Sequence, residues 1–250
     1  MLEISVIIPT FQKPAILYRV LENLTRQTLP KDNFEIIVID DDASFDIESM
    51  VTGFSARFKN LHYHKQNQKG QSCARNAGVK AAKSSLIFLT GDDILLAPDV
   101  LELHIKFHSS CPHKNIAVMG NIKVDPGLMG DNFIQWLHES GVQNNFSDLR
   151  KSGFIPHFRV ETAHLSVPKK YLDRVKFDEN LKYYENLVWS EDLFQLGFLF
   201  YYLKEAESFH YHPTSLKEYA SRYREVGRTI RYLKEPGRDF YFFRTQTVKP

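Results

Sequence analysis

Three clusters of acidic residues are the part of this sequence best suited to chemistry. They are Asp40–Asp42, Asp92–Asp93 and Glu191–Asp192. Carboxylates that crowd together repel one another unless a cation or a sugar hydroxyl lies between them. Oxygen ligands of this kind suit Mg²⁺ or Mn²⁺, and both ions in turn suit a diphosphate. The clusters therefore predict a site for a divalent cation and a phosphate-bearing ligand, although each cluster alone is equally typical of a helix cap or a turn.

The first two clusters follow apolar runs that are typical of buried strands. Strands alternate with helices over residues 1–120, which predicts a mostly parallel, doubly wound sheet. Ligands bind outside the carboxyl ends of the strands in such sheets, so Asp40–Asp42 and Asp92–Asp93 are expected at one edge. The expected strands are Ile4–Pro9, Phe34–Ile39, Leu61–His64, Leu86–Leu89 and Ile116–Met119, and the expected helices run from Pro14 to about Gln27, from Asp46 to Phe58, from Ser72 to Lys83, and onward from Pro98.

The pattern changes after Gly120. Residues 125–160 are polar and punctuated by glycine and proline, so we expect a long loop with a function. Regular structure is expected to return as a helix near Glu191–Leu203, a strand near Ser208–His212 and a helix over Ser215–Leu233. We interpret the chain as one domain with three parts, comprising residues 1–120, 121–212 and 213–250.

Composition excludes several classes of protein. The 250 residues are 43% apolar and 25% charged with a net charge of +2, which is typical of globular proteins and too weakly basic for a nucleic-acid binder. Two cysteines cannot build a disulfide framework. The longest apolar-rich stretch, Leu193–Leu203, is shorter than the ~20 residues of a membrane helix. We therefore expect a cytoplasmic protein without a nucleic-acid partner.

Five motifs, in their order along the chain, resemble those of family 2 glycosyltransferases. The segment Glu161–Pro168, followed by Phe177–Glu179, is also similar to the family's region before its catalytic Glu-Asp pair. The resemblance implies the GT-A fold, an α/β architecture with a Rossmann-like, mostly parallel sheet flanked by helices and a C-terminal elaboration on the acceptor side. It also implies an inverting, metal-dependent hexosyltransferase that uses a nucleotide-sugar, with a UDP-sugar as the family-level expectation. The motifs are Ser5–Phe11, Asp41–Ser44, Ala74–Gly78, Gly91–Asp93 with Pro98–Asp99, and Glu191–Asp192.

The resemblance assigns donor-side roles. It implies that Pro9, Thr10, Phe11 and Asp41 hold the nucleoside. A guanidinium at Arg75 would pair with the diphosphate through its fork of donors.

The resemblance also assigns the metal site. Asp92 is the preferred metal ligand, and Asp93 would touch the ribose or the donor sugar. His212 is preferred to His210 as a further ligand, and their spacing on a strand puts both rings on one face. The chain departs from the family pattern at Thr90, where the first acid of an Asp-x-Asp element often stands.

The acceptor-side roles fall on the last acidic pair. Asp192 would act as the general base that takes the proton of the acceptor hydroxyl, and Glu191 would bind acceptor hydroxyls. The alternative is that both acids favour the dipole in the first turn of a helix. His164 stands where the family often has asparagine. The resemblance implies a glycan or a lipid-linked saccharide as acceptor, and a role in polysaccharide synthesis.

The expected last helix combines an apolar stripe with basic residues. This pattern is typical of a solvated charged face beside a core stripe, and it also suits peripheral contact with an anionic membrane surface. The basic residues are Arg222, Arg224, Arg228, Arg231 and Lys234.

Two other functions are compatible with the acidic edge. A nucleotidyltransferase shares a similar sheet, but usually has a Gly-rich basic N-terminal loop, which Pro9–Lys13 is not. A non-catalytic module that binds sugar-nucleotides or glycans would show binding without turnover.

Overall fold

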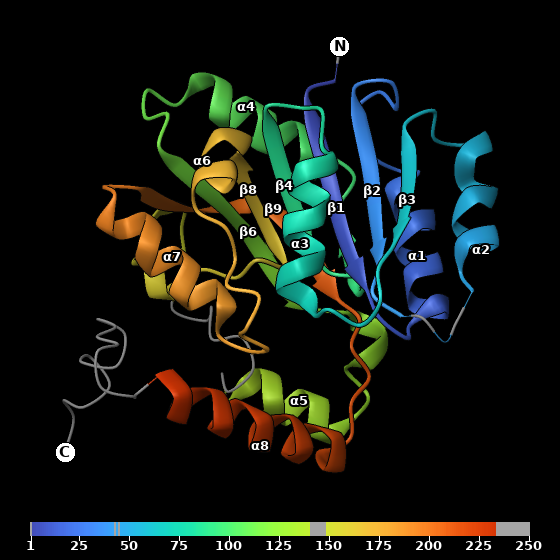
Figure 1. Cartoon of the computed structure of the whole chain (residues 1–250), viewed down its shortest axis with the longest axis vertical. Coiled ribbons are helices and arrows are strands. Elements are labelled where there is room, and N and C mark those ends of the chain that lie inside the picture. The colour runs from blue at the N-terminus through green and yellow to red at the C-terminus, as the bar shows by residue number, and fades with distance from the viewer. Residues whose placement is uncertain (1, 43, 45, 141–148, 234–250) are drawn as a thin grey trace.

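The computed structural model describes residues 2–42, 44, 46–140 and 149–233. Nine strands in these residues form one sheet, with the order β3-β2-β1-β4-β8-β6-β9-β5 and with β7 paired to β9 (Figure 1). The strands are β1 (Ile4–Thr10), β2 (Phe34–Asp40), β3 (Leu61–Lys65), β4 (Leu86–Thr90), β5 (Ile94–Leu96), β6 (Ile116–Val124), β7 (Gly153–Phe154), β8 (His164–Pro168) and β9 (Leu199–His210).

The sheet is parallel in its first half and mixed in its second. Strands β3, β2, β1 and β4 run parallel to one another, and β6 runs parallel to β9. Strand β8 is antiparallel to both β4 and β6, between which it lies. Because Thr90 at the end of β4 pairs with His164 at the start of β8, the chain enters β8 at the carboxyl edge of the parallel strands.

Helices cover both faces of the sheet. Alternate side chains of β1 divide between two apolar clusters: Ile4, Val6 and Ile8 belong to the cluster that includes α1 and α4, and Ile7 to the one that includes α3, α6 and α7. The helices are α1 (Pro14–Leu24), α2 (Glu48–Thr52), α3 (Gln71–Ala81), α4 (Val100–Ser110), α5 (Asn132–Glu139), α6 (Lys169–Arg174), α7 (Glu185–Gln195) and α8 (Leu216–Leu233).

The small residues of α3 allow a close approach to the sheet. A Cβ atom added at Gly78 would lie 2.4 Å from Cγ2 of Ile7, so only glycine fits this contact with β1. The first turn of α3 is thereby held close to the carboxyl edge of β1.

The late helix predicted near Glu191–Leu203 is wrong in its bounds. Helix α7 already begins at Glu185 and ends at Gln195, and residues Leu199–Leu203 belong to β9. Gly197 has a φ of +73°, a left-handed conformation that ends the helix. Aromatic residues that favour strands follow it. Glu191 and Asp192 therefore lie in the middle of α7 and not in its first turn.

The long loop predicted over residues 125–160 is also only partly correct, since α5 and β7 lie within it. Helix α5 contacts α8 through Phe133 and Tyr219, whose ring centroids are 5.8 Å apart. Figure 1 shows α5 and α8 beyond the arrowheads of β1 and β2, across the carboxyl edge of the sheet. The prediction for Lys234 falls outside the described residues. No helix in the described part of the chain is long and apolar enough to span a membrane.

A network of buried histidines lies between β8 and α4. His164 contacts Nε2 of His104 at 3.1 Å and the Ser208 hydroxyl at 2.7 Å. A Cβ atom at Gly120 would lie 2.1 Å from His164 Nε2, so the ring fills the space beside this glycine. Burial lowers the pKa of His164 to about 3 and that of His104 well below its ordinary value. His164 is thus a core residue, and its position among these partners explains why it makes no contact at the sheet edge.

These histidines predict acid sensitivity. Both pKa values are lower in the folded protein than in the unfolded chain, where a histidine titrates near 6.5. The unfolded chain then binds more protons below pH 6.5, so each histidine stabilises the fold above that pH and loses its contribution as the pH falls. We expect the free energy of unfolding to fall by about 1.4 kcal/mol per pH unit for each of the two.

Urea unfolding at pH 7.5, 6.0 and 5.0 measures this dependence. In the variant His164→Asn, the free energy of unfolding should depend less steeply on pH, by the contribution of one histidine. In His113→Asn, which changes an exposed histidine, the dependence on pH should be that of wild type. An unchanged slope in His164→Asn would contradict this explanation.

Candidate active site

The carboxyl edge of the sheet brings together residues from β1 and from the turn after β4. The Thr10 hydroxyl donates to Oδ2 of Asp92 at 2.8 Å. Lys13 Nζ donates to Asp93 at 2.8 Å and to Asp92 at 3.3 Å. Burial lowers the pKa of Lys13, but the charges of Asp93 and Asp92 outweigh this and raise it overall. Lys13 is therefore a cation fixed at the edge, a feature that the sequence analysis did not single out.

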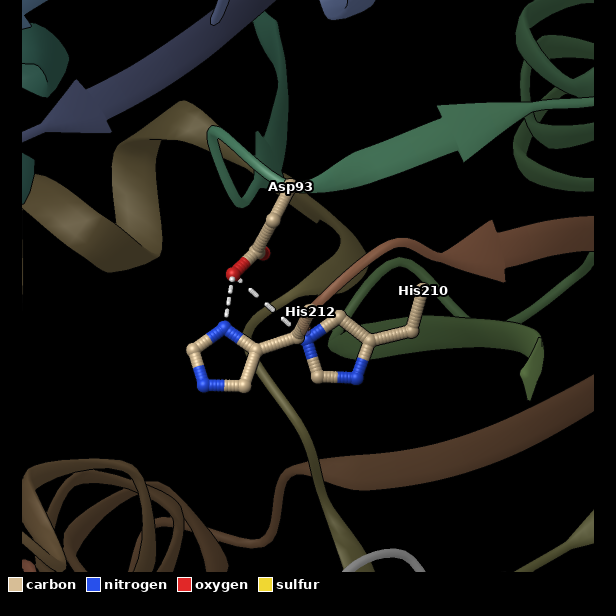
Figure 2. Close-up of side chains that lie close together, drawn as sticks. All are labelled: Asp93, His210 and His212. Atoms are coloured by element: carbon tan, nitrogen blue, oxygen red, sulfur yellow. Dashed lines mark hydrogen bonds and ion pairs between the residues drawn. The ribbon is translucent and has the colours of Figure 1, made fainter. Parts of the chain in front are cut away.

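Asp93 faces two histidines at the end of β9. Its Oδ2 lies 3.2 Å from Nδ1 of His212 and 3.5 Å from Nε2 of His210 (Figure 2). The Tyr211 amide donates to the Asp93 carbonyl at 2.8 Å, which fixes the two segments against each other. Burial opposes ionisation of Asp93, yet His210, His212 and Lys13 hold its pKa well below the ordinary value.

The two aspartates differ in their surroundings. Burial and the charge of Asp93 raise the pKa of Asp92. Lys13 contacts both aspartates, but Asp92 also accepts from Thr10, whereas Asp93 also contacts the histidines. The sequence analysis preferred Asp92 as the metal ligand, and the structure instead brings Asp93 to the histidines.

Asp93, His210 and His212 form a group that could hold a metal ion. One ligand atom from each lies within 4.8 Å of the others. A set of one carboxylate oxygen and two imidazole nitrogens suits Mn²⁺ or a similar transition metal better than Mg²⁺, which prefers oxygen ligands. The residues therefore fit a divalent cation, in agreement with the expectation of a metal at this edge.

The aspartates after β2 have different partners. Asp41 accepts hydrogen bonds from the backbone amides of Lys69 and Gly70, at 2.7 and 2.8 Å, and from the Gln66 side chain at 2.9 Å. Asp42 accepts from the amide and the hydroxyl of Ser44 through Oδ1, and its Oδ2 is buried. The contacts of Asp41 thus hold the loop before α3, and those of Asp42 hold the turn after β2.

Arg75 has a buried partner. Its Nη1 donates to Oε1 of Glu185 at 2.5 Å, and both side chains are almost wholly buried. The guanidinium also lies 5.3 Å from the Phe177 ring. These contacts satisfy the charge of Arg75 within the protein, and its pairing with a diphosphate stays a prediction. Nothing in the sequence points to Glu185 as its partner.

The two acids of α7 do not join the edge. Glu191 is buried and bonds to His157 at 2.8 Å and to Gln195 at 2.7 Å. The residue Asp192 is exposed at the surface of α7. Partial burial of its carboxyl group, and then the charges of Glu191 and Asp178, raise its pKa. Within the described residues, no hydrogen bond or ion pair connects either acid to Asp92, Asp93 or the histidines.

Glu161 is a second acid near the edge, in the segment just before β8. Its side chain is partly exposed, and the Asn186 amide donates to it at 3.5 Å. Burial and then the charge of Glu185 raise its pKa to about 7. Its segment resembles the family's, but the sequence alone assigns Glu161 no role.

A cleft of about 360 Å³ adjoins Lys13 and His212. It lies where α8 and the segment after β9 approach the end of β1. Its lining combines cationic and aromatic side chains, a composition that suits a polar ligand with a sugar or phosphate group. The lining residues include Lys13, Tyr183, His212, Tyr219 and Arg222.

The model of the family described as Glycosyl transferase family 2 matches residues 5–165. The chain belongs to this family. A glycosyltransferase of Rickettsia felis, described as uncharacterized, is 26% identical over 192 residues, which are 76% of this chain and 29% of that protein. The poly(ribitol-phosphate) beta-N-acetylglucosaminyltransferase TarP of Staphylococcus aureus is 33% identical over 106 residues, 41% of this chain and 32% of that protein. The chain thus spans less than a third of the length of either relative.

Solved structures of glycosyltransferases share the fold of this family 2 chain. S. aureus TarS 1-349 in complex with UDP has a TM-score of 0.66 at 19% identity, over 93% of this chain and 66% of that one. The mannosyltransferase PcManGT from Pyrobaculum calidifontis, in complex with GDP-Man and Mn²⁺, has a TM-score of 0.67 at 19% identity, over 92% and 64%. The predicted GT-A fold is confirmed.

Proposed function

We propose that this family 2 chain is an inverting, metal-dependent glycosyltransferase. It moves a sugar from a nucleotide-sugar to a hydroxyl of a glycan or a lipid-linked acceptor. The observation that carries the proposal is the contact of Asp93 with His210 and His212, beside the Lys13–Asp92 ion pair, at the carboxyl edge where α/β sheets bind ligands.

The donor binds along the end of β1 and the triplet after β2. Phe11 is 44% exposed and offers its ring to the base, while Pro9 and Thr10 are buried in the strand. Asp41 would accept from the base or the ribose, and it also holds the loop before α3 through the Lys69 and Gly70 amides. The complex of TarS with UDP supports a uridine nucleotide as the first donor to test.

The diphosphate lies beside Lys13 and the metal ligands. Asp93, His210 and His212 would hold the cation, with Asp92 close by. When bound, Mn²⁺ or Mg²⁺ neutralises the charge that develops on the departing diphosphate. Lys13 adds a second positive charge at the same edge, which favours the leaving group in the transition state.

The acceptor approaches from the cleft beside α8. Tyr183 and Tyr219 provide aromatic surface for a sugar, and Arg222 lies near the Tyr183 ring. The sequence predicts Asp192 as the general base and Glu191 as an acceptor contact, and the described contacts of Glu191 are with His157 and Gln195. Peripheral membrane contact through the basic face of α8 also stays a prediction.

Calorimetric titration of UDP-, GDP- and dTDP-sugars, with Mn²⁺, with Mg²⁺ and with EDTA, tests the donor site. We expect one nucleotide to bind in a metal-dependent way, and Asp92→Ala to weaken this binding at least tenfold because Lys13 and Thr10 lose their partner. Asp173→Ala, a change at an exposed aspartate of α6, should bind normally. If no nucleotide-sugar binds with either metal, the transferase proposal fails and a different ligand must be sought.

A further inference from the structure

We infer that Glu161 is the general base of the transfer, an inference that rests on the proposed function. Strand β8 enters the sheet at His164, which pairs with Thr90 just before Asp92 and Asp93. Glu161 therefore precedes the strand on the same edge as the metal ligands, while Asp192 lies two helical turns along α7 from Glu185.

Contacts with α7 and β6 hold Glu161 and its segment. The Asn186 amide donates to the Val160 carbonyl at 2.8 Å and reaches Oε2 of Glu161 at 3.5 Å. The Glu161 backbone amide lies 3.3 Å from Sδ of Met119 in β6. The first turn of α7 and strand β6 thus position the segment, and part of the side chain is left exposed to receive a substrate.

The charges around Glu161 belong to the site and to the cleft. The groups that act on it are Glu185 from α7, Arg222 from α8, Arg75 from α3 and His210 from β9. His210 is a metal-ligand candidate and Arg222 lines the cleft, so charges from both parts of the site act on Glu161.

This environment suits a base at neutral pH. Burial and the charge of Glu185 raise the Glu161 pKa to about 7, where a carboxylate is a much stronger base than at its ordinary value and is still ionised in part. Asp192 has different surroundings, because the residue is exposed on α7 and the charges that act on it are those of the acids Glu191 and Asp178.

The proposed step is a single displacement. The acceptor oxygen forms a bond to the anomeric carbon while the bond from that carbon to the diphosphate oxygen breaks, and the electron pair leaves with the nucleoside diphosphate. The acceptor proton passes to Glu161 and then to solvent. Asn186 and Glu185 act as positioning residues, since neither contacts the acceptor in this scheme.

Hydrolysis of the donor tests the inference, because water can serve as the acceptor. The probe is the nucleotide-sugar of the UDP, GDP and dTDP panel that binds best, with Mn²⁺, and the readout is released nucleoside diphosphate. Glu161→Gln should lower the release by about 10²–10⁴-fold, the range of general-base catalysis, with donor affinity within twofold of wild type. The exposed control Glu102→Gln should stay within threefold.

Two further measurements separate a chemical role from a structural one. The wild-type rate should fall below a midpoint near pH 7, because Glu161 must be ionised to act, and this limb should be missing from the residual activity of Glu161→Gln. Glu161→Asp, which keeps a shorter carboxylate, should recover part of the rate. If Glu161→Gln remains within threefold of wild type, or if Asp192→Asn alone abolishes release, the inference is overturned and the proposed function stands. If wild type neither binds nor cleaves any donor, the proposed function itself fails, and the inference with it.

Discussion

Replacing Asp93 with asparagine is expected to reduce nucleoside diphosphate release by about 10³-fold, which corresponds to several kcal/mol of lost charge stabilisation in the transition state. Asp93 is the one carboxylate that contacts both His210 and His212 among the described residues. Asparagine keeps the shape of the side chain but not the negative charge that binds a cation. The variant should also lose any increase in melting temperature that Mn²⁺ gives the wild-type protein.

The matched control for Asp93→Asn is Asp173→Asn, which changes an exposed aspartate of α6 to the same residue. Both variants should have circular dichroism spectra like that of wild type. Activity of Asp93→Asn within threefold of wild type, together with an unchanged response to Mn²⁺, would refute the assignment of the metal site.

Breaking the Arg75–Glu185 pair is expected to have the largest effect on stability. Arg75→Met leaves Glu185 buried without its partner, and Glu185→Met does the same to Arg75. Loss of one partner of a buried ion pair costs about 3–5 kcal/mol, because an uncompensated charge remains inside the protein. The double variant removes both charges and should recover most of this loss. Urea unfolding of the three variants measures these differences.

The same variants decide between two roles for Arg75. If Arg75→Met folds with wild-type stability but no longer binds a nucleoside diphosphate, the guanidinium serves the donor and not the fold. We expect the reverse, since its contacts lie within the protein.

The first half of the fold was predictable because each parallel strand is a short apolar run with a turn at its end. The runs Ile4–Pro9 and Phe34–Ile39 match β1 and β2 closely. The rule that carboxyl ends of parallel strands share an edge then places Asp92 and Asp93 near Thr10, as the structure shows. Local sequence was sufficient where neighbours in the sheet follow one another closely along the chain.

The second half depends on contacts between distant segments. Strand β8 lies between β4 and β6, although it follows both in the sequence. The apolar run around Leu193–Leu203 fits a buried helix and a strand equally well, and only the conformation of Gly197 divides it between α7 and β9. A pattern of apolar residues carries no information on such a division.

The sequence was also insufficient to predict which side chains of the candidate site contact one another. The sequence identifies the Asp92–Asp93 pair and the two histidines, but not which aspartate faces them, because this depends on the direction of successive side chains in a turn. The pairing of Arg75 with Glu185 joins α3 to α7 across 110 positions of the chain. Spacing within a motif cannot reveal a partner at that distance.

The most direct test of the central claim is the release of nucleoside diphosphate from UDP-, GDP- and dTDP-sugars by the wild-type protein in the presence of Mn²⁺. The account predicts slow release from one class of donor, abolished by EDTA and by Asp93→Asn. Equal release in EDTA, or binding of a nucleotide-sugar without any release, would contradict a metal-dependent transferase at this site.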